Sequence, residues 1–155
     1  MKKNLIALGA ALLCAAGAHA QSSVQLTGLV DVFAGSMKMA GDASSKSVVD
    51  SGGLTTSWFG MKGTEDLGGG LKASFNYEQG INAETGATDS ATFQRQANMS
   101  LSGRAGTLKM GRALTPSFYG VAAWELTGAA NYSVVGNTFS WSGAGSRNNS
   151  QWAYT

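Results

Sequence analysis

The chain has 155 residues, with eleven Lys or Arg against nine Asp or Glu, and its formal net charge of +2 is too small to indicate a nucleic-acid-binding surface. Its single His (His19) and single Cys (Cys14) both lie within the first 20 residues. If those residues are removed on export, the remaining chain has no imidazole or thiol. This excludes His- and Cys-based metal sites and His-dependent catalytic triads, so we expect neither a cofactor nor an enzyme.

Residues 1–20 have the pattern of a secretory signal peptide. Lys2 and Lys3 form a basic start, residues 5–16 form an apolar run, and Ala18-His19-Ala20 is a small-x-small cleavage site. The apolar run is shorter than the ~20 residues that a membrane-spanning helix needs. Cleavage after Ala20 would leave residues 21–155, in which nine basic residues balance nine acidic ones.

Downstream of the signal, apolar and polar residues alternate with a period of two, which is typical of β-strands with two different faces. The alternation predicts six strands, at residues 24–34, 57–64, 71–78, 96–101, 107–111 and 147–154. One face of these strands is apolar, and the other carries charged residues such as Lys62, Lys72 and Glu78.

The connections between these strands alternate in length. Short turns are expected at 65–70 and 102–106, and long polar connections at 35–56 and 80–91. Residues 115–146 contain no comparable strand and form the longest predicted loop.

Two architectures fit this pattern: a secreted β-sandwich with one face in a core, and an outer-membrane β-barrel with one face in lipid. Charged strands of ~8–10 residues and the alternation of short and long connections favour the barrel. We therefore expect an all-β, transmembrane antiparallel barrel. A passive pore is the leading function, and a small barrel with a structural or adhesive role and a secreted carbohydrate-binding sandwich are the alternatives.

Residues 59–73, with the sequence FGMKGTEDLGGGLKA, closely resemble a strand-turn-strand of the general-diffusion porins of Gram-negative bacteria, especially the betaproteobacterial type. Further stretches resemble the same family in the expected order, at 23–31, 93–97, 101–103, 110–112, 115–116 and 146–150. The resemblance extends over essentially all of residues 21–155.

This resemblance implies a sixteen-stranded barrel that forms a homotrimer in the outer membrane, in contact with lipid and lipopolysaccharide, and passes small hydrophilic solutes and ions. A third external loop, at about 116–143, would fold inward and narrow the pore. In such porins basic side chains on the wall face acidic ones on the loop, and the transverse field filters solutes. The constriction residues that the resemblance implies are Arg95, Arg147, Lys62, Arg112, Trp58 and Glu125.

Three of these residues have a second interpretation. Arg95 shares parity with Ala97, which would direct it toward lipid unless a bulge or a rim position intervenes. Lys62 fits a solvated charge on the pore wall without a role in selectivity. Trp58 fits either the pore lining or the aromatic girdle near the rim.

The sequence also departs from the family pattern. Many members of the family that it resembles have Arg at the position of Trp58. Glu125 is the only acidic residue after Asp89, so we expect few acidic side chains on the loop side of the pore and a weak preference for anions. Six strands cannot close a sixteen-stranded barrel, because an open edge in lipid leaves backbone groups unpaired at several kcal/mol each. We therefore expect the sequence to be a fragment or a truncated reading frame that could not conduct alone.

Overall fold

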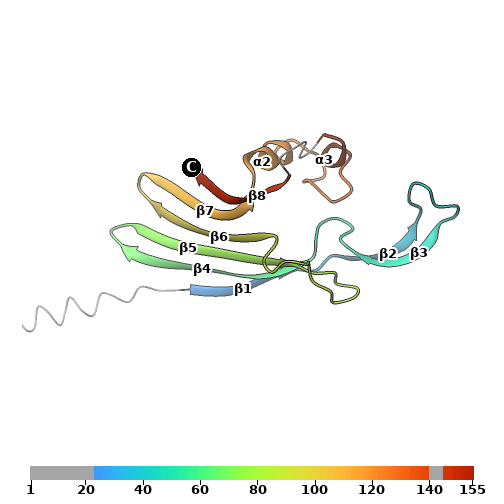
Figure 1. Cartoon of the computed structure of the whole chain (residues 1–155), viewed down its shortest axis with the longest axis horizontal. Coiled ribbons are helices and arrows are strands. Elements are labelled where there is room, and N and C mark those ends of the chain that lie inside the picture. The colour runs from blue at the N-terminus through green and yellow to red at the C-terminus, as the bar shows by residue number, and fades with distance from the viewer. Residues whose placement is uncertain (1–22, 140–144) are drawn as a thin grey trace, which may run out of the picture.

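Six antiparallel strands form one curved sheet in the computed structural model, which describes residues 23–139 and 145–155 (Figure 1). The strands are β1 (Ser23–Leu29), β4 (Trp58–Gly68), β5 (Leu71–Gly80), β6 (Gln96–Gly103), β7 (Gly106–Leu114) and β8 (Arg147–Tyr154). They pair in the order β1-β4-β5-β6-β7-β8, so each strand lies beside the next one in this sheet. Five of the six expected strands are thus confirmed and the first is shorter than expected, while the predicted signal peptide lies outside the described residues.

The sheet is a single layer with one apolar face. Register places Leu26 beside Met61, and Met61 in turn beside Tyr77. The side chains on this face are largely exposed, 86% for Leu26 and 71% for Trp152, and Ala113 is the one buried hydrophobic residue in the described part of the chain. A β-sandwich would bury this face against a second sheet. A broad apolar surface with nothing packed on it is what a lipid-facing barrel wall requires.

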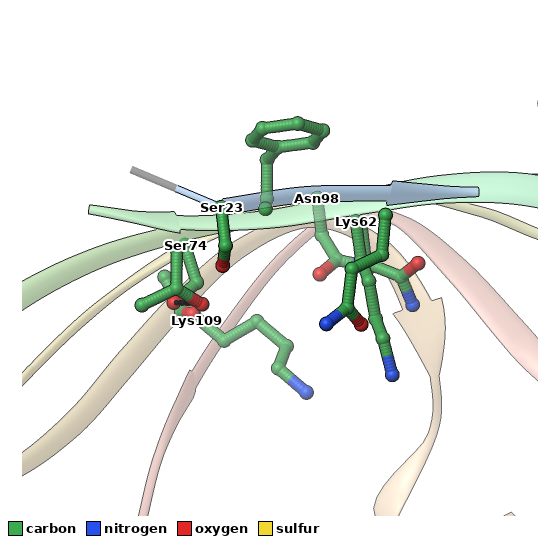
Figure 2. Close-up of a pocket in the computed structure, with 11 residues that line it drawn as sticks. Ser23, Lys62, Ser74, Asn98 and Lys109 are labelled. Carbon is green, nitrogen blue, oxygen red and sulfur yellow. Dashed lines mark hydrogen bonds between the residues drawn. The ribbon is translucent and has the colours of Figure 1, made fainter. Parts of the chain in front are cut away.

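The opposite face is polar, and its residues form rows across the strands. One row joins Lys62, Asn76 and Asn98, and the next joins Ser74, Ser100 and Lys109. Figure 2 shows Lys62, Asn98 and Lys109 projecting from the same side of the sheet, the side toward which it curves. In a closed barrel the concave side is the interior, so this row pattern is that of a water-filled lumen.

Short and long connections lie at opposite ends of the strands (Figure 1). The β4–β5 turn contains three consecutive glycines with positive φ, Gly68, Gly69 and Gly70 at 85°, 61° and 82°. This left-handed backbone is accessible to glycine at little cost, which explains the Gly-Gly-Gly sequence. The long connections, including the described residues 115–139 and 145–146, gather at the other end.

Two expectations near the N-terminus are wrong. The predicted strand 24–34 is interrupted after Leu29, and the predicted polar loop 35–56 contains a hairpin of β2 (Val32–Met37) and β3 (Lys46–Ser51). Asp42 closes the tip of the hairpin by accepting a hydrogen bond from Met39 N at 3.1 Å and pairing with Lys46 Nζ at 3.1 Å. Cross-strand pairing with β2 stabilises β3 although its Ser, Lys and Asp content resembles that of a loop.

The long connection after β7 contains two short helices, α2 (Pro116–Ala122) and α3 (Val134–Phe139). Thr115 caps α2 by accepting a hydrogen bond from Phe118 N, and Pro116 occupies the first helical position, where no backbone donor is needed. Residues 140–143 of the predicted inward loop lie outside the described residues. In the described ranges, no helix has the length and apolar character needed to cross a membrane.

Candidate functional site

Three arginines from separate segments line one cleft at the long-connection end of the sheet. Arg95 precedes β6, Arg112 lies in β7 and Arg147 begins β8. They share the cleft with Asp89, which lies on the connection between β5 and β6. The structure therefore brings together three of the six residues that the family resemblance implied.

Backbone carbonyls of the segment before β6 hold two of these arginines. Arg147 Nε donates to Arg95 O at 2.7 Å, and Arg112 Nε donates to Gln94 O. Arg112 Nη1 also donates to Asn149 Oδ1 at 2.6 Å. Charge-assisted bonds of this kind orient the guanidinium groups and offset part of their mutual repulsion.

Glu78 is the acidic residue in direct contact with this cluster. Its side chain is only 10% exposed, and Oε2 lies 3.5 Å from Arg95 Nε. Its other oxygen, Oε1, accepts hydrogen bonds from Gln96 Nε2 at 2.9 Å and Asn76 Nδ2 at 3.1 Å. Sequence reasoning placed Glu78 on the polar face but not in the site. The signal in the sequence was its position near the end of β5, because the connection that follows β5 leads directly to Arg95, just before the neighbouring strand.

Strict alternation would direct Arg95 toward lipid, but it does not apply because Arg95 lies just before the first residue of β6. β6 begins at Gln96, and Phe93 has a φ of 53°, so regular alternation does not extend back to residue 95. As a result both Arg95 and Gln96 reach Glu78, although neighbours within a regular strand would face opposite sides.

A similar irregularity lies at the start of β8. The β7–β8 register shifts between Gly111 and Ala113, and Ser150 has a φ of 50°. Alternation from Gln151 back to Arg147 is therefore broken, and the position of Arg147 rests on its contact with Arg95 rather than on parity.

Trp58 lies under the Arg95 side chain. The Arg95 Cζ atom is 5.8 Å from the centroid of the indole, within the range of a cation–π contact. This contact brings Trp58 to the arginine cluster and not to the girdle on the apolar face.

Lys62 lies apart from the arginines. It lines a second pocket with Lys109, Ser23, Ser74 and Asn98, nearer the middle of the strands (Figure 2). Lys109, in β7, is not among the residues that the family resemblance implied. The register identifies it, because Lys109 pairs with Ser100 and continues the row from Ser74.

Glu125 is engaged within its own loop. Its Oε2 atom accepts hydrogen bonds from Thr127 N at 2.9 Å, Thr127 Oγ1 at 2.7 Å and Ala129 N at 2.7 Å. These bonds, first of all the one from the Thr127 side chain, hold the pKa of Glu125 below its ordinary value. Across residues 23–139 and 145–155, no ion pair joins Glu125 to an arginine. The acids beside the arginines are Glu78 and Asp89.

Residues 129–131 of the loop line a cavity that adjoins the cleft and shares Arg95 and Arg147 with it. A cavity of about 240 Å³ is lined by Ala129, Ala130 and Asn131 from the loop, together with Arg95 and Arg147. Thr55 and Thr56 complete this lining from the connection between β3 and β4. Within the described part of the chain, no group of three or more His, Cys, Asp or Glu side chains could hold a metal ion.

The family profile described as Gram-negative porin matches residues 6–155. The chain belongs to the Gram-negative porin family. It is 42% identical over 130 residues to outer membrane porin protein 32 of Delftia acidovorans, covering 83% of this chain and 36% of that protein. It is 38% identical over 124 residues to the major outer membrane protein P.IB of Neisseria meningitidis serogroup B, covering 72% of this chain and 34% of that protein.

A solved porin has the same fold. The structure described as an anion-selective porin from Comamonas acidovorans aligns with a TM-score of 0.72 and 33% identity, over 86% of this chain and 42% of that one. The expected fold class, an all-β transmembrane barrel, and the outer-membrane location are thus confirmed. This porin chain spans about a third of the length of the curated relatives that it matches.

Proposed function

We propose that this porin chain supplies part of the wall and constriction of a passive outer-membrane channel that favours small anions. The arrangement of Arg95, Arg112 and Arg147 around one cleft carries the proposal, since Glu78 and Asp89 are the only acidic residues near them in the described part of the chain. Fixed positive charge along a narrow aqueous path attracts anions and repels cations. The solutes would be small and hydrophilic, because the lining side chains are polar.

The remaining candidate residues have secondary roles in this proposal. Lys62 and Lys109 would extend the positive surface along the lumen, and Trp58 would hold the Arg95 side chain. The segment 116–143 would be the inward loop, which its residues 129–131 support by lining a cavity together with Arg95 and Arg147. Glu125 would stabilise the loop from within, and the acidic wall would be formed by Glu78 and Asp89.

The assembly and the surroundings follow from the family. The channel would be a homotrimer embedded in outer-membrane lipid and lipopolysaccharide, with no reaction and no cofactor. Its closest support is the family match and the likeness to a porin described as anion-selective.

Ion selectivity in a planar bilayer tests the proposal. Protein extracted from outer membranes of cells that express this gene is placed in a bilayer that separates two KCl concentrations. We expect the reversal potential to be shifted from zero toward the Nernst potential of chloride. Arg95→Gln and Arg147→Gln should each move it toward zero. Arg104→Gln is the matched control, because Arg104 lies in the short β6–β7 turn at the opposite end of the strands. Cation selectivity would overturn the anion preference, and the absence of conductance would favour a structural or adhesive barrel.

A further inference from the structure

The long hairpin that starts with β1 contains an unusually large bulge. The β1–β4 pairing ends at Leu29 opposite Trp58, and the β2–β3 pairing begins at Val32 opposite Ser51. Between these pairs, Val30 and Asp31 on one side face residues 52–57 on the other. We call residues 52–57 the strap. Because it has several residues more than its partner, the strap must leave the plane of the sheet.

Asp31 holds the strap in one conformation. Its carboxylate accepts hydrogen bonds from three consecutive backbone amides, those of Leu54 and Thr55 at 2.8 Å and that of Gly53 at 3.1 Å. The backbone of Asp31 also bonds the Ser57 hydroxyl, which is fully buried, so both ends of the strap are tied to one residue. A carboxylate that gathers several amides is a strong local anchor, because each bond is charge-assisted.

The strap in turn holds the loop that follows β7. Asn131 N donates to Leu54 O at 2.8 Å, and Asn131 Nδ2 donates to Gly52 O at 2.9 Å. We call these two bonds the latch. They join segments 79 residues apart in the sequence. The loop segment 129–131 and strap residues Thr55 and Thr56 border the same cavity as Arg95 and Arg147.

We propose that Asp31 is a positioning residue that, through the strap and the latch, fixes the loop segment 129–131 beside the arginines and thereby sets the width of the constriction. The inference rests on the proposed channel function. Asp31 bonds only the strap and its neighbours, so its effect on the loop passes through Gly52 and Leu54. Thr55 and Thr56 make the strap itself a second narrowing element beside the loop.

Asp31→Asn tests this chain of contacts, because it keeps the size of the side chain but turns one acceptor oxygen into a donor that faces amide donors. The matched control is Asp42→Asn, which removes the same charge from the same hairpin. Asp42 bonds only Met39, at its N and O atoms, and Lys46 at the tip. The measurements are single-channel conductance, the size limit for sugars in liposome swelling, and hydrogen exchange at the Asn131 amide.

We expect Asp31→Asn to increase conductance and admit larger sugars, while the sign of the reversal potential stays the same. Exchange protection at the Asn131 amide should fall roughly fivefold or more, because the bond to Leu54 loses its fixed acceptor. Asn131→Leu should act in the same direction. The double variant should exceed neither single variant, since both changes open the same latch.

Gly52→Ala provides a second route if Asp31→Asn fails to fold. Gly52 has a φ of 83°, and a Cβ atom there would lie 2.9 Å from Asn131 Nδ2, so the substitution displaces the latch while leaving the Asp31 carboxylate in place. Wild-type protein that does not conduct would overturn the channel function and this inference with it. If the wild type conducts but these variants leave the conductance, the size limit for sugars or the exchange protection at Asn131 unchanged, the inference alone is overturned.

Discussion

The Nε atom of Arg147 donates a hydrogen bond to the backbone carbonyl of Arg95 at 2.7 Å, across 52 residues of sequence. The bond connects the start of β8 with the segment before β6, and it fixes two cations of the proposed constriction relative to each other. A cluster of like charges is stable only when each charge has acceptors of its own. Here Glu78 forms an ion pair with Arg95, and two backbone carbonyls accept hydrogen bonds from Arg147 and Arg112.

Removing the charge of Arg147 should weaken anion preference. A unit charge a few ångströms from the ion path contributes about 1 kcal/mol in a watery pore, which corresponds to about a fivefold change in the anion-to-cation permeability ratio. Arg147→Gln should therefore lower that ratio about fivefold in reversal-potential measurements. Arg147→Lys keeps the charge and should stay within about twofold of wild type. Equal losses in both variants would show that the bond to Arg95 O, and not the charge, matters.

Glu78→Gln should have the opposite effect. It removes the negative charge 3.5 Å from Arg95 Nε while keeping an oxygen that can accept from Asn76 or Gln96. We expect the reversal potential to move further toward the Nernst potential of chloride. Glu65→Gln, near the short-turn end of β4, is the control and should leave it unchanged. A shift of the reversal potential toward the Nernst potential of potassium would contradict the assignment of Glu78 as the opposing acid.

Trp58 should stabilise the orientation of Arg95 through its aromatic face. Trp58→Leu removes a cation–π contact worth about 0.5–1 kcal/mol at such sites, whereas Trp58→Phe keeps a weaker one. We expect noisier channel openings in Trp58→Leu and intermediate behaviour in Trp58→Phe. Identical recordings from both variants would show that Arg95 does not depend on the ring.

The apolar face should tolerate charge poorly. Leu26 lies in the middle of β1 on that face, and Leu26→Arg should lower the free energy of unfolding by about 2–4 kcal/mol if the position faces the bilayer midplane. Gln25→Arg, one residue earlier on the polar face, should have little effect. Urea-induced unfolding in lipid vesicles measures both, and equal destabilisation would contradict the assignment of the two faces.

The Asp31 anchor should weaken only under strong acid. Hydrogen bonds from the Thr55 and Leu54 amides hold the pKa of Asp31 below its ordinary value of 3.8. A carboxylate with a lowered pKa contributes stability that is fully present above that ordinary value and is lost as the pH falls through the folded-state pKa. Exchange protection at Gly53, Leu54 and Thr55 should therefore persist at pH 5 and decline below about pH 4.

Glu125 allows a comparison within the same protein. Its pKa is also lowered, and its bonds protect the Thr127 and Ala129 amides rather than the strap. Glu125→Gln should remove the acid dependence at Thr127 and Ala129 and leave that at Gly53 to Thr55 intact. Loss of both together would show that the two anchors are not independent.

Local pattern was sufficient for the main sheet and insufficient for the hairpin before β4. Period-two alternation in β5 and β6 follows from one face in lipid and one in water, and each residue reports its own face. The strand β3 has no such pattern, and its pairing with β2 holds it in the hairpin. The hydrogen bonds of the Asp31 carboxylate hold residues 53–55 after β3 and join residues 22 to 24 apart, so a short window of sequence does not contain them.

The same limit applies to the site. Arg95 and Arg147 were expected from family motifs, while alternation alone would have misplaced Arg95 because β6 begins one residue after it. Glu125 was expected as the acidic partner since it is the only acid in the loop, yet its carboxylate bonds Thr127 and Ala129. Glu78 takes the place beside Arg95 because strand register brings them together.

The sequence by itself determined the all-β class, the two faces of the sheet, the family and the basic character of the site, since each of these depends on residue type and short-range order. Only the tertiary structure decided which acid meets Arg95, where Trp58 lies, and how Asp31 is connected to Asn131 through the strap. These relationships depend on register, on a bulge and on loop closure, where a shift of one residue changes every partner.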